Sequence, residues 1–574
     1  MKKVWPSFPI VAQCVNYNRD KLSSDLIAAA VVTIMLIPQS LAYAMLAGLP
    51  PQYGLYASIM PIVVYSILGS SSTLAVGPVA IASIMTASAL SSVTQAGLIS
   101  YVDGAILLAL LSGGFLMLLG FFRFGFIANF LSHSVVAGFI TASGLLIALS
   151  QMKHILGVTV SGHNFFDMVV SLFSVMTKVH MMTLIIGASS IVFLLLARKF
   201  AAKLLFMCGV PLDMAKTLSR VAPVVGVIAT TVIVASLRLD QSGVAVVGDI
   251  PSGIGQFGLP SFNLEAVKAL LLPAIFISII GYVESISVGR TLAAKRQEKI
   301  VANQELVALG GANIASGLFG AFPVTGGFSR SVVNFDAGAQ TQFAGIYTAI
   351  AIAIASFFLT QLLYFLPIAM LAATIVVAVL SLVDFSVITH AWRFSKSDFY
   401  AIITTIILTL TLGVEAGVAS GIIVSIILHL YYTSRPHVAE IGLLPGGEHF
   451  RNINHYKVET IPHVVSLRID ESLLFSNVNY IEDYIDELVM NRPYVTDIIL
   501  HCGAINTIDL SALEMLDALN MRLNALDVRL NLSELKVPVK ASLMRAHFFD
   551  RLGGTLYLSQ YEAYMALSQK SQLS

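Results

Sequence analysis

The sequence predicts a polytopic α-helical membrane protein that ends in a small cytoplasmic α/β domain. Three observations lead to this prediction. Of the 574 residues, 57% are hydrophobic and only 11% are charged, whereas ordinary soluble domains carry roughly 25% charged residues. Apolar runs close to the length of a bilayer-spanning helix recur between about residues 25 and 433. After Arg435-Pro436 the composition becomes that of a soluble domain, in which strand-like and helical patterns alternate.

An N-terminal arm of residues 1–25 precedes a transmembrane domain of residues 26–433, in which we expect fourteen membrane segments. Their approximate bounds, in order, are 26–49, 54–68, 73–90, 103–122, 126–149, 181–197, 220–237, 264–289, 300–319, 326–337, 341–363, 366–382, 398–413 and 415–432. Seven segments fall in each of two halves, about 26–238 and 264–433. Because seven is odd, the halves would cross the membrane in opposite directions, as in the inverted repeats of transporters.

Lysine and arginine predict the orientation. When the N-terminal arm is placed in the cytoplasm, most basic loop residues fall on the cytoplasmic side, and the opposite side holds only Lys153, Lys178, Arg238 and Lys268. This asymmetry follows the positive-inside rule. It places the N-terminus and the C-terminal domain in the cytoplasm, and we expect the protein in the inner (plasma) membrane of the cell.

Glycine and proline interrupt the third and tenth segments. One interruption lies in residues 73–80 around Gly77-Pro78, and the other lies in residues 320–331 around Gly326-Gly327. Hydrocarbon tolerates such backbone only where it lines a cavity. In the second interruption we expect an extended approach over 322–325 and then a half-helix from near Gly326, whose first N–H groups carry the positive end of a helix dipole. Two such starts in corresponding halves predict an anion site; the alternative is a pair of packing kinks in ordinary transmembrane helices.

Two charged residues inside predicted segments are candidates for a functional site. Glu284 is deep in the eighth segment, and Arg330 is in the tenth. A charge at such depth is costly and marks a functional site by default. Desolvation would favour the protonated form of Glu284 and Arg330 would favour its ionised form, so this carboxyl could load a proton alongside an anion. The alternatives are a structural salt bridge between the two residues, or a glutamic acid held neutral by hydrogen bonds.

Three polar side chains add hydrogen-bonding capacity near these charges. Gln39 and Tyr43 follow Pro38 in the first segment, one helical turn apart, so they share one face. They could donate hydrogen bonds to an oxyanion, or they could join neighbouring helices. Ser329 offers a hydroxyl at the start of the half-helix, with a local backbone hydrogen bond as its alternative role.

No motif predicts an enzyme, a cofactor, a metal site or a nucleic-acid partner. Cys14, Cys208 and Cys502 are far apart in the sequence, which gives neither a disulfide framework nor a metal-ligand spacing. Nothing resembles a nucleotide-binding loop or a nucleophile–base set. We therefore expect transport or sensing rather than catalysis.

Several stretches are similar, in the same order, to motifs of the sulfate permease (SulP) anion transporters, also called solute carrier family 26. They are Ile37-Pro38-Gln39, Leu46-Ala47-Gly48-Leu49-Pro50-Pro51, Ala75-Val76-Gly77-Pro78, Glu284-Ser285-Ile286-Ser287, Asn303-Gln304-Glu305 and Thr325-Gly326-Gly327-Phe328-Ser329-Arg330-Ser331. The resemblance implies fourteen segments in two inverted repeats. Segments one to four and eight to eleven would form a core domain, and the others a gate domain. It also implies an anion between the half-helices, alternating access by movement of the core against the gate, and a dimer.

The resemblance implies a set of substrate-binding residues as well. By position, the residues that match the lining of the family's anion site are Gln39, Tyr43, Val79, Phe328, Ser329 and Arg330. The interrupted backbone adds Val76, Gly77, Thr325, Gly326 and Gly327. The expected partners are the anion, a proton, membrane lipid and a second copy of the chain.

The residue at position 284 bears on the coupling ion. Sodium-coupled bicarbonate members of similar fold carry aspartate where Glu284 stands and threonine where Val288 stands. The resemblance therefore points to proton-coupled symport, with sulfate as the first choice. Bicarbonate or C4-dicarboxylate transport, chloride/bicarbonate exchange and an anion channel are the alternatives.

The C-terminal tail resembles the STAS domain, a module shared with anti-sigma-factor antagonists. We expect a linker over 434–455 and the STAS domain over 456–574. Strands are predicted at 464–469, 497–501 and 528–532, and helices at 478–490, 510–525, 540–552 and 560–567. Ser511 stands where soluble relatives carry a phosphorylatable serine, and a phosphate there would meet a helix N-terminus. The alternative is that Ser511 is a simple N-cap.

Overall fold

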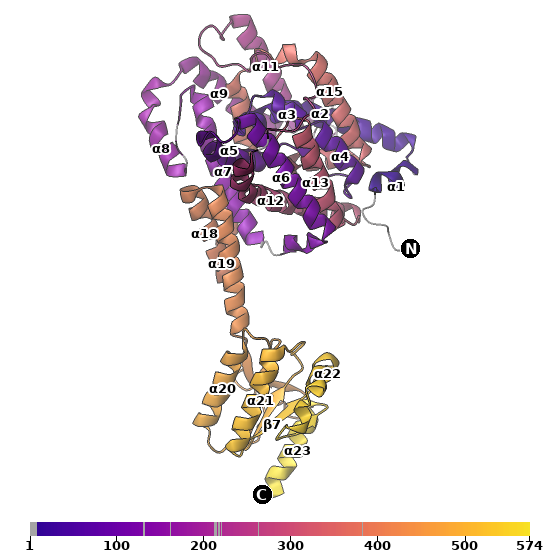
Figure 1. The fold of residues 1–574 in the computed structure, drawn as a ribbon, viewed down its shortest axis with the longest axis vertical. Coiled ribbons are helices and arrows are strands. Elements are labelled where there is room, and N and C mark those ends of the chain that lie inside the picture. The colour runs from indigo at the N-terminus through magenta and orange to yellow at the C-terminus, as the bar shows by residue number, and fades with distance from the viewer. Residues whose placement is uncertain are drawn as a thin grey trace. The chain divides into compact units, whose positions relative to one another are not determined.

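The computed structural model describes residues 8–15, 17–129, 133–160, 162, 164–209, 211, 215, 219, 221–261, 263–380 and 383–573. The chain divides into two compact units, Met1–Val424 and Ser425–Ser574. The first is all-helical apart from two very short strands, and the second is an α/β unit (Figure 1).

Helices fill the first unit in the order in which the apolar segments predict them. They are α1 (Pro9–Val15), α2 (Arg19–Leu46), α3 (Gln52–Tyr56), α4 (Met60–Leu68), α5 (Ala80–Gln95), α6 (Tyr101–Phe121), α7 (His133–Leu156), α8 (Phe165–Ser174), α9 (Met181–Met207), α11 (Ala222–Leu237), α12 (Leu264–Arg296), α13 (Ala302–Leu318), α14 (Phe328–Asp336), α15 (Phe343–Phe358), α16 (Ile368–Leu380), α17 (Ser386–Phe394), α18 (Lys396–Leu412) and α19 (Val414–Ser434). Among the described residues, six helices are long and apolar enough to cross a membrane, namely α2, α6, α7, α9, α12 and α19. Two helices lie in segments predicted as connections, α8 and α17.

The starts of the long helices follow from their cap residues. Asn18 precedes α2, Ser100 precedes α6 and Asn263 precedes α12, and each of these side chains accepts a hydrogen bond from an N–H group of the first turn. Such caps satisfy backbone groups that have no partner within the helix.

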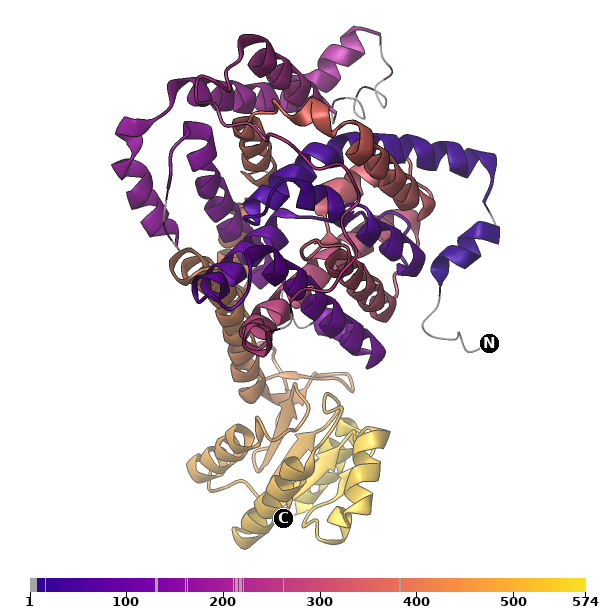
Figure 2. The same ribbon diagram turned by 45° about the horizontal axis from the view of Figure 1, so that its top comes forward.

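Helices from the two halves of the first unit pack against each other, so neither half forms a core alone (Figure 2). The pairs with extensive contact include α6 with α13, α2 with α15, and α7 with α16. Glycines bring α6 and α13 together: a Cβ added to Gly113 would lie 2.7 Å from the backbone nitrogen of Ile314, and one added to Gly310 would lie 2.8 Å from that of Met117. Small residues allow this close approach, which is how helices associate in lipid.

The two interrupted segments meet each other. Strand β1 (Val76–Gly77) pairs antiparallel with β2 (Thr325–Gly326), with Val76 opposite Gly326 and Gly77 opposite Thr325. Each strand leads into a helix, α5 after β1 and α14 after β2, and Gly327 is the N-cap of α14. The prediction of an extended approach followed by a half-helix is confirmed, and continuous kinked helices are excluded.

The second unit contains a six-stranded sheet in the order β4-β3-β5-β6-β7-β8. Its elements are β3 (Val438–Leu443), β4 (Phe450–Asn452), β5 (Val464–Ile469), α20 (Val478–Asn491), β6 (Asp497–His501), α21 (Leu510–Ala525), β7 (Arg529–Ser533), α22 (Val537–Arg545), β8 (Leu556–Tyr557) and α23 (Gln560–Leu573). Strands β5 to β8 run parallel, and β3 pairs antiparallel with β5 and β4. The segment 434–455, predicted as a linker, therefore holds two strands of the sheet.

The close contact of α6 and α13 gives a stability prediction with an internal control. A Gly113→Val substitution forces side-chain atoms into the backbone of α13, and overpacking of this kind costs about 1–3 kcal/mol. The neighbouring Gly114 has no heavy atom within 4 Å of an added Cβ, so Gly114→Val is expected to leave the unfolding temperature unchanged. Thermal unfolding of the purified protein in detergent should show a lower midpoint for Gly113→Val only, and equal midpoints for the two variants would contradict the packing argument.

Candidate functional site

The paired strands place two helix N-termini next to each other in the apolar unit. The first bond of the α5 ladder runs from the Ser83 N–H to the Val79 carbonyl, and that of α14 runs from the Ser331 N–H to the Gly327 carbonyl, both at 3.0 Å. In each helix the three N–H groups before this bond have no backbone acceptor among the described residues. Such groups carry the positive end of the helix dipole, so the two starts form one region of positive potential.

Strand β2 is fixed by α12. The Ser285 hydroxyl accepts a hydrogen bond from the Gly326 N–H at 2.8 Å and lies 2.8 Å from the Thr325 hydroxyl. Thr325 in turn donates to the Gly281 carbonyl at 2.7 Å. Gly281 allows this approach, because a Cβ there would lie 3.0 Å from the Thr325 hydroxyl. The strand is therefore bonded to the helix that carries Glu284.

The approach to β2 is fixed by α13. The Asn313 side chain accepts from the Val324 N–H at 2.9 Å and donates to the Val324 carbonyl at 2.8 Å. The Ser316 hydroxyl donates to the Phe322 carbonyl at 2.6 Å. These bonds satisfy backbone groups that have no helix partner, which is the condition for irregular backbone at membrane depth.

The turn before β1 is held by a buried carboxylate. Glu305 on α13 accepts hydrogen bonds from the Tyr65 hydroxyl at 2.8 Å and from both the N–H and the hydroxyl of Ser70 at 2.7 Å. Glu305 is 1% exposed. Glu305 therefore positions β1, as Asn313 positions β2. The motif Asn303-Gln304-Glu305 did not by itself reveal this role.

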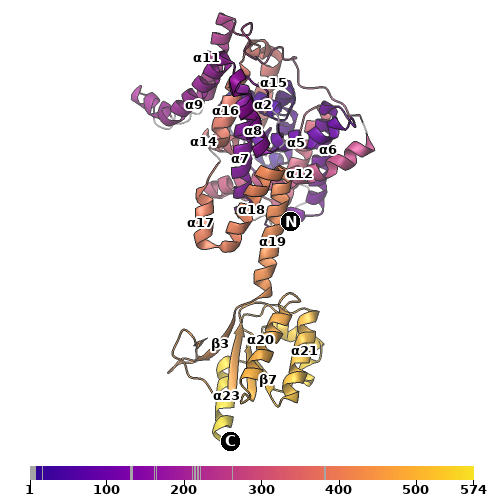
Figure 3. The ribbon, with the colours of Figure 1, turned by 90° about the vertical axis from the view of Figure 1, so that its left-hand side faces the viewer.

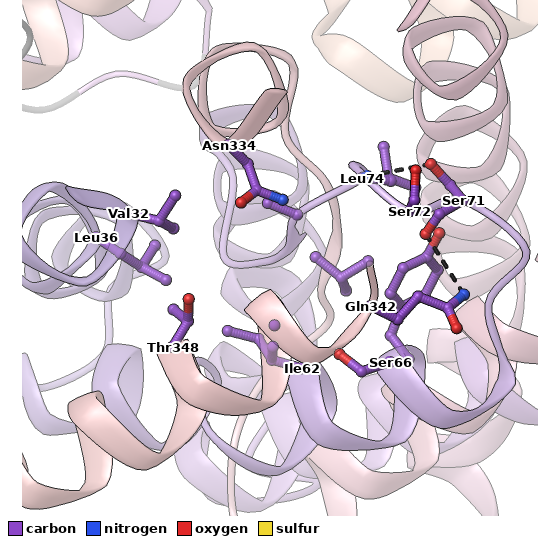
Figure 4. Close-up of a pocket in the computed structure, with 14 residues that line it drawn as sticks. Val32, Leu36, Ile62, Ser66, Ser71, Ser72, Leu74, Asn334, Gln342 and Thr348 are labelled. Atoms are coloured by element: carbon purple, nitrogen blue, oxygen red, sulfur yellow. Dashed lines mark hydrogen bonds between the residues drawn. The ribbon is translucent and has the colours of Figure 1, made fainter. Parts of the chain in front are cut away.

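A small cavity lined by both apolar and polar side chains lies behind β1 (Figure 4). Leu74 and Val76 line it on the side of β1, and Asn334 of α14 and Gln342 line it from other elements. Asn334 donates to the Thr73 carbonyl at 3.1 Å, and the Gln342 side chain donates to backbone carbonyls of the same turn. Polar side chains therefore surround the first strand on this side as well.

Arg330 is buried between the starts of α5 and α14, and its terminal nitrogens have no hydrogen-bond partner. Its side chain is 2% exposed, and neither Nη1 nor Nη2 has a hydrogen-bond partner. The guanidinium occupies space left by two glycines: a Cβ on Gly77 would lie 2.7 Å from Nη1, and one on Gly327 would lie 2.8 Å from Nε. Tyr43 and Glu284 interact with it electrostatically. A desolvated guanidinium with free donors is a strong binder of planar or tetrahedral oxyanions.

Glu284 lies in an apolar pocket beside this charge. The pocket is lined by side chains of α5, α7, α12 and α19, namely Ile81, Val135, Val136, Phe139, Ile140, Ile280, Val283 and Val418. The Oε2 atom of Glu284 is buried without a hydrogen-bond partner. Among the described residues, the salt bridge between Glu284 and Arg330 considered above does not form. Glu284 and Arg330 therefore interact electrostatically but do not form an ion pair.

The other predicted site residues differ in their burial and in whether they interact with Arg330. Val76, Gly77 and Val79 are buried in and after β1. Phe328 is 47% exposed and Ser329 is exposed, both in the first turn of α14. Gln39 and Tyr43 are half-buried on α2; the electrostatic interaction with Arg330 joins Tyr43 to the site, and Gln39 stands one turn before it.

Ser511 is not the N-cap of its helix. Asp509 has that role: its Oδ1 accepts from the Ala512 N–H at 2.9 Å and its Oδ2 accepts from the Phe475 N–H at 2.7 Å. Ser511 is half-buried in the first turn of α21. The N-cap is therefore two residues earlier than in the alternative in which Ser511 caps the helix. A carboxylate is a better acceptor than a hydroxyl, which explains the difference.

The groups that meet between α5 and α14 are hydrogen-bond donors, which in proteins commonly bind anions. These donors are backbone N–H groups and a guanidinium. Within the described part of the chain, no group of three or more His, Cys, Asp or Glu residues is placed to hold a metal ion, and Cys14, Cys208 and Cys502 are free.

Comparison with known proteins adds an independent line of argument. The model of the sulfate permease family matches residues 22–405, and that of the STAS domain matches residues 455–563. The chain is 35% identical over 543 residues to "Sulfate transporter 4.1, chloroplastic" of Arabidopsis thaliana, covering 92% of this chain and 77% of that protein. It is 33% identical over 547 residues to "Probable sulfate transporter Rv1739c" of Mycobacterium tuberculosis, covering 95% of each.

A solved structure shares the fold. The murine solute carrier 26 family member A9 anion transporter in the inward-facing state superposes with a TM-score of 0.89 at 24% identity, covering 99% of this chain and 94% of that one. At this identity the match shows the fold alone.

The contact between Gly77 and Arg330 gives a binding prediction. In Gly77→Ala the added methyl displaces Nη1, and the backbone φ of 153° is unfavourable for alanine. Gly253→Ala is the matched control, because Gly253 has a φ of 138° and no heavy atom within 4 Å of an added Cβ. Calorimetric titration with sulfate should show weaker binding by about tenfold or more for Gly77→Ala only. Equal weakening in both variants would mean that backbone strain, and not Arg330, is responsible.

Proposed function

The chain belongs to the sulfate permease family, whose members are membrane anion transporters, and from that premise we propose that it carries sulfate or a related small oxyanion across the membrane together with a proton. The observation that carries the proposal is Arg330, buried with two unpartnered nitrogens beside two helix N-termini. An unpaired buried charge is expensive. A bound anion would pair with these nitrogens and remove that cost.

Substrate choice follows from the donors. Helix starts and one guanidinium recognise a small anionic group by its charge and its acceptor oxygens. The sulfate transport named for the relatives makes sulfate the first choice.

We propose that the membrane unit crosses the bilayer fourteen times in two inverted repeats, about 26–238 and 264–433. The antiparallel pairing of β1 with β2 supports this, because each strand precedes a half-helix at an equivalent place. In the proposed arrangement α2 to α6 and α12 to α15 form the core domain and the other membrane helices form the gate. The N-terminus and the STAS domain face the cytoplasm, the membrane is the plasma membrane, and two copies form a dimer.

Glu284 is the proposed proton site. Its pocket is shared by α5 and α12 of the proposed core and by α7 and α19 of the proposed gate. An anion beside Arg330 cancels the positive charge that favours the ionised carboxylate, so anion and proton would bind cooperatively. With a proton on Glu284, the pocket that holds a dianion carries one negative charge fewer than it would with Glu284 ionised, which lowers the cost of moving it through a low-dielectric region.

The STAS domain is proposed to regulate transport. A phosphate on Ser511 would lie in the first turn of α21, where the helix dipole favours negative charge. It would also lie close to the Asp509 carboxylate that caps the same helix. Repulsion between the two would loosen the contact of Asp509 with Phe475, so phosphorylation would change the shape of this loop.

Arg330→Gln tests the anion site. Loss of a charged hydrogen-bond donor costs about 1.5–3 kcal/mol, which is about 10- to 100-fold in affinity. We expect that weakening of sulfate binding in calorimetric titration of the purified protein. Lys268→Gln, on the exposed face of α12, is the control and should bind sulfate normally. Unchanged binding in Arg330→Gln would remove Arg330 from the site.

Glu284→Gln tests proton coupling. In proteoliposomes, uptake of labelled sulfate by the unmodified protein should be saturable, accelerated by an inward proton gradient and indifferent to sodium. The variant keeps the shape of the side chain but cannot ionise, so it should lose gradient-driven accumulation and retain sulfate–sulfate exchange. Gradient-driven uptake at the normal rate in the variant would exclude Glu284 as the proton site, and large unitary currents in the unmodified protein would indicate a channel.

A further inference from the structure

Helix α17 lies outside the transport site and has the composition of a membrane-interface helix. It follows α16 and runs beside α18 (Figure 3). Three aromatic side chains on or next to it are exposed: Phe385 by 55%, Trp392 by 50% and Phe394 by 85%. Aromatic residues concentrate where the hydrocarbon of a membrane meets its headgroups.

A pocket of about 400 Å³ opens beside α17. Its lining combines hydroxyl groups and the His390 imidazole with one permanent charge of each sign: Ser386, Thr389, His390 and Arg393 come from α17, Asp398 comes from α18, and Ser134 comes from α7. We refer to it as the α17 pocket. It is far larger than a single water molecule requires, and it does not include any residue assigned to transport.

The two charges of the α17 pocket do not neutralise each other. Among the described residues Arg393 forms no ion pair or hydrogen bond. Asp398 accepts a hydrogen bond from the Ser134 hydroxyl at 2.7 Å through Oδ1. The nearby Lys396 lies over the Trp392 ring at 3.9 Å from its centroid, and its ammonium is engaged there. A ligand that fits the α17 pocket therefore carries both a negative and a positive group.

We propose that the α17 pocket binds the headgroup of a membrane phospholipid that carries a phosphate and a protonated primary amine, the phosphatidylethanolamine class. Arg393 binds the phosphate. Asp398 accepts a hydrogen bond from the ammonium. The exposed aromatic side chains lie against the glycerol and acyl region.

Charge complementarity selects this lipid over its neighbours in the bilayer. A choline headgroup has a positive charge but no N–H to donate to Asp398. A glycerol headgroup leaves the negative charge of Asp398 uncompensated next to a phosphate. The inference rests on the membrane placement in the proposed function but not on the identity of the cargo.

Trp392 supplies a local reporter. The sequence has two tryptophans, so Trp5→Phe leaves Trp392 as the sole fluorophore. This variant is reconstituted into phosphatidylcholine vesicles that contain the same fraction of brominated-chain phosphatidylethanolamine, phosphatidylcholine or phosphatidylglycerol. We expect quenching to give an apparent affinity about two- to fivefold higher for phosphatidylethanolamine than for phosphatidylcholine, the size expected for one exposed charge pair.

Substitutions separate the two ends of the headgroup. In the Trp5→Phe background, Arg393→Gln and Asp398→Asn should each bring the affinity ratio towards one. Asp398→Asn keeps a carbonyl oxygen for the Ser134 hydroxyl, so the contact of α18 with α7 persists. Lys178→Gln, an exposed basic residue on another element, is the control and should keep the ratio.

Two outcomes would overturn the proposal. Equal quenching by phosphatidylethanolamine and phosphatidylcholine would show no selectivity. Stronger quenching by phosphatidylglycerol would show simple attraction of anionic lipid. Because fluorescence does not depend on transport, a variant without sulfate uptake leaves this test intact, and failure of this test leaves the transport proposal intact.

Discussion

The antiparallel pairing of β1 and β2 is the constraint on which the rest of the membrane unit depends. Two interrupted helices expose backbone groups that lipid cannot satisfy, and each strand supplies the partner for the other. The same pairing fixes the direction of α5 and α14, so their free N–H groups point into one region. Without this pairing the two interruptions would leave backbone groups unsatisfied. The guanidinium of Arg330 would then not be held between Gly77 and Gly327.

Arg330 shows how the site differs from its scaffold. The polar groups that hold the two strands in place have partners: Ser285 bonds to Gly326, Asn313 bonds to Val324, and Glu305 bonds to Ser70. The guanidinium alone keeps two free nitrogens among these groups, and glycines at two positions make room for it. A structural salt bridge with Glu284 would have been the cheaper arrangement. Because this salt bridge is absent, the Arg330 guanidinium can bind an anion and the Glu284 carboxyl can bind a proton.

The sequence made the unusual residues of the membrane unit easy to find. Hydrocarbon excludes glycine–proline breaks and charges, so the two interruptions, Glu284 and Arg330 stand out against the apolar background. The partners that hold them do not stand out. Serine, threonine and asparagine in apolar helices usually bond to their own helix, so the sequence does not distinguish Asn313 or Ser285 from ordinary helix residues. In the second unit, β4 and β8 were missed because strands of three and two residues at the edges of the sheet carry little periodicity. β3 was missed because it lies in the stretch predicted as a linker. Asp509 took the place of Ser511 as the cap because a carboxylate is the stronger acceptor.

The distribution of hydrogen bonds bears on how such a site would move. β1 and β2 are bonded to each other, β2 is bonded to α12, and its approach is bonded to α13. Pulling one strand away would leave several buried groups unsatisfied, at about 1–3 kcal/mol each. The wall that α7 and α19 add around Glu284 consists of apolar side chains, whose contacts have no preferred direction. The bonded elements would therefore move as one body, and the apolar boundary is where they can slide against the remaining helices. Alternating access by movement of the proposed core against the proposed gate would require this behaviour.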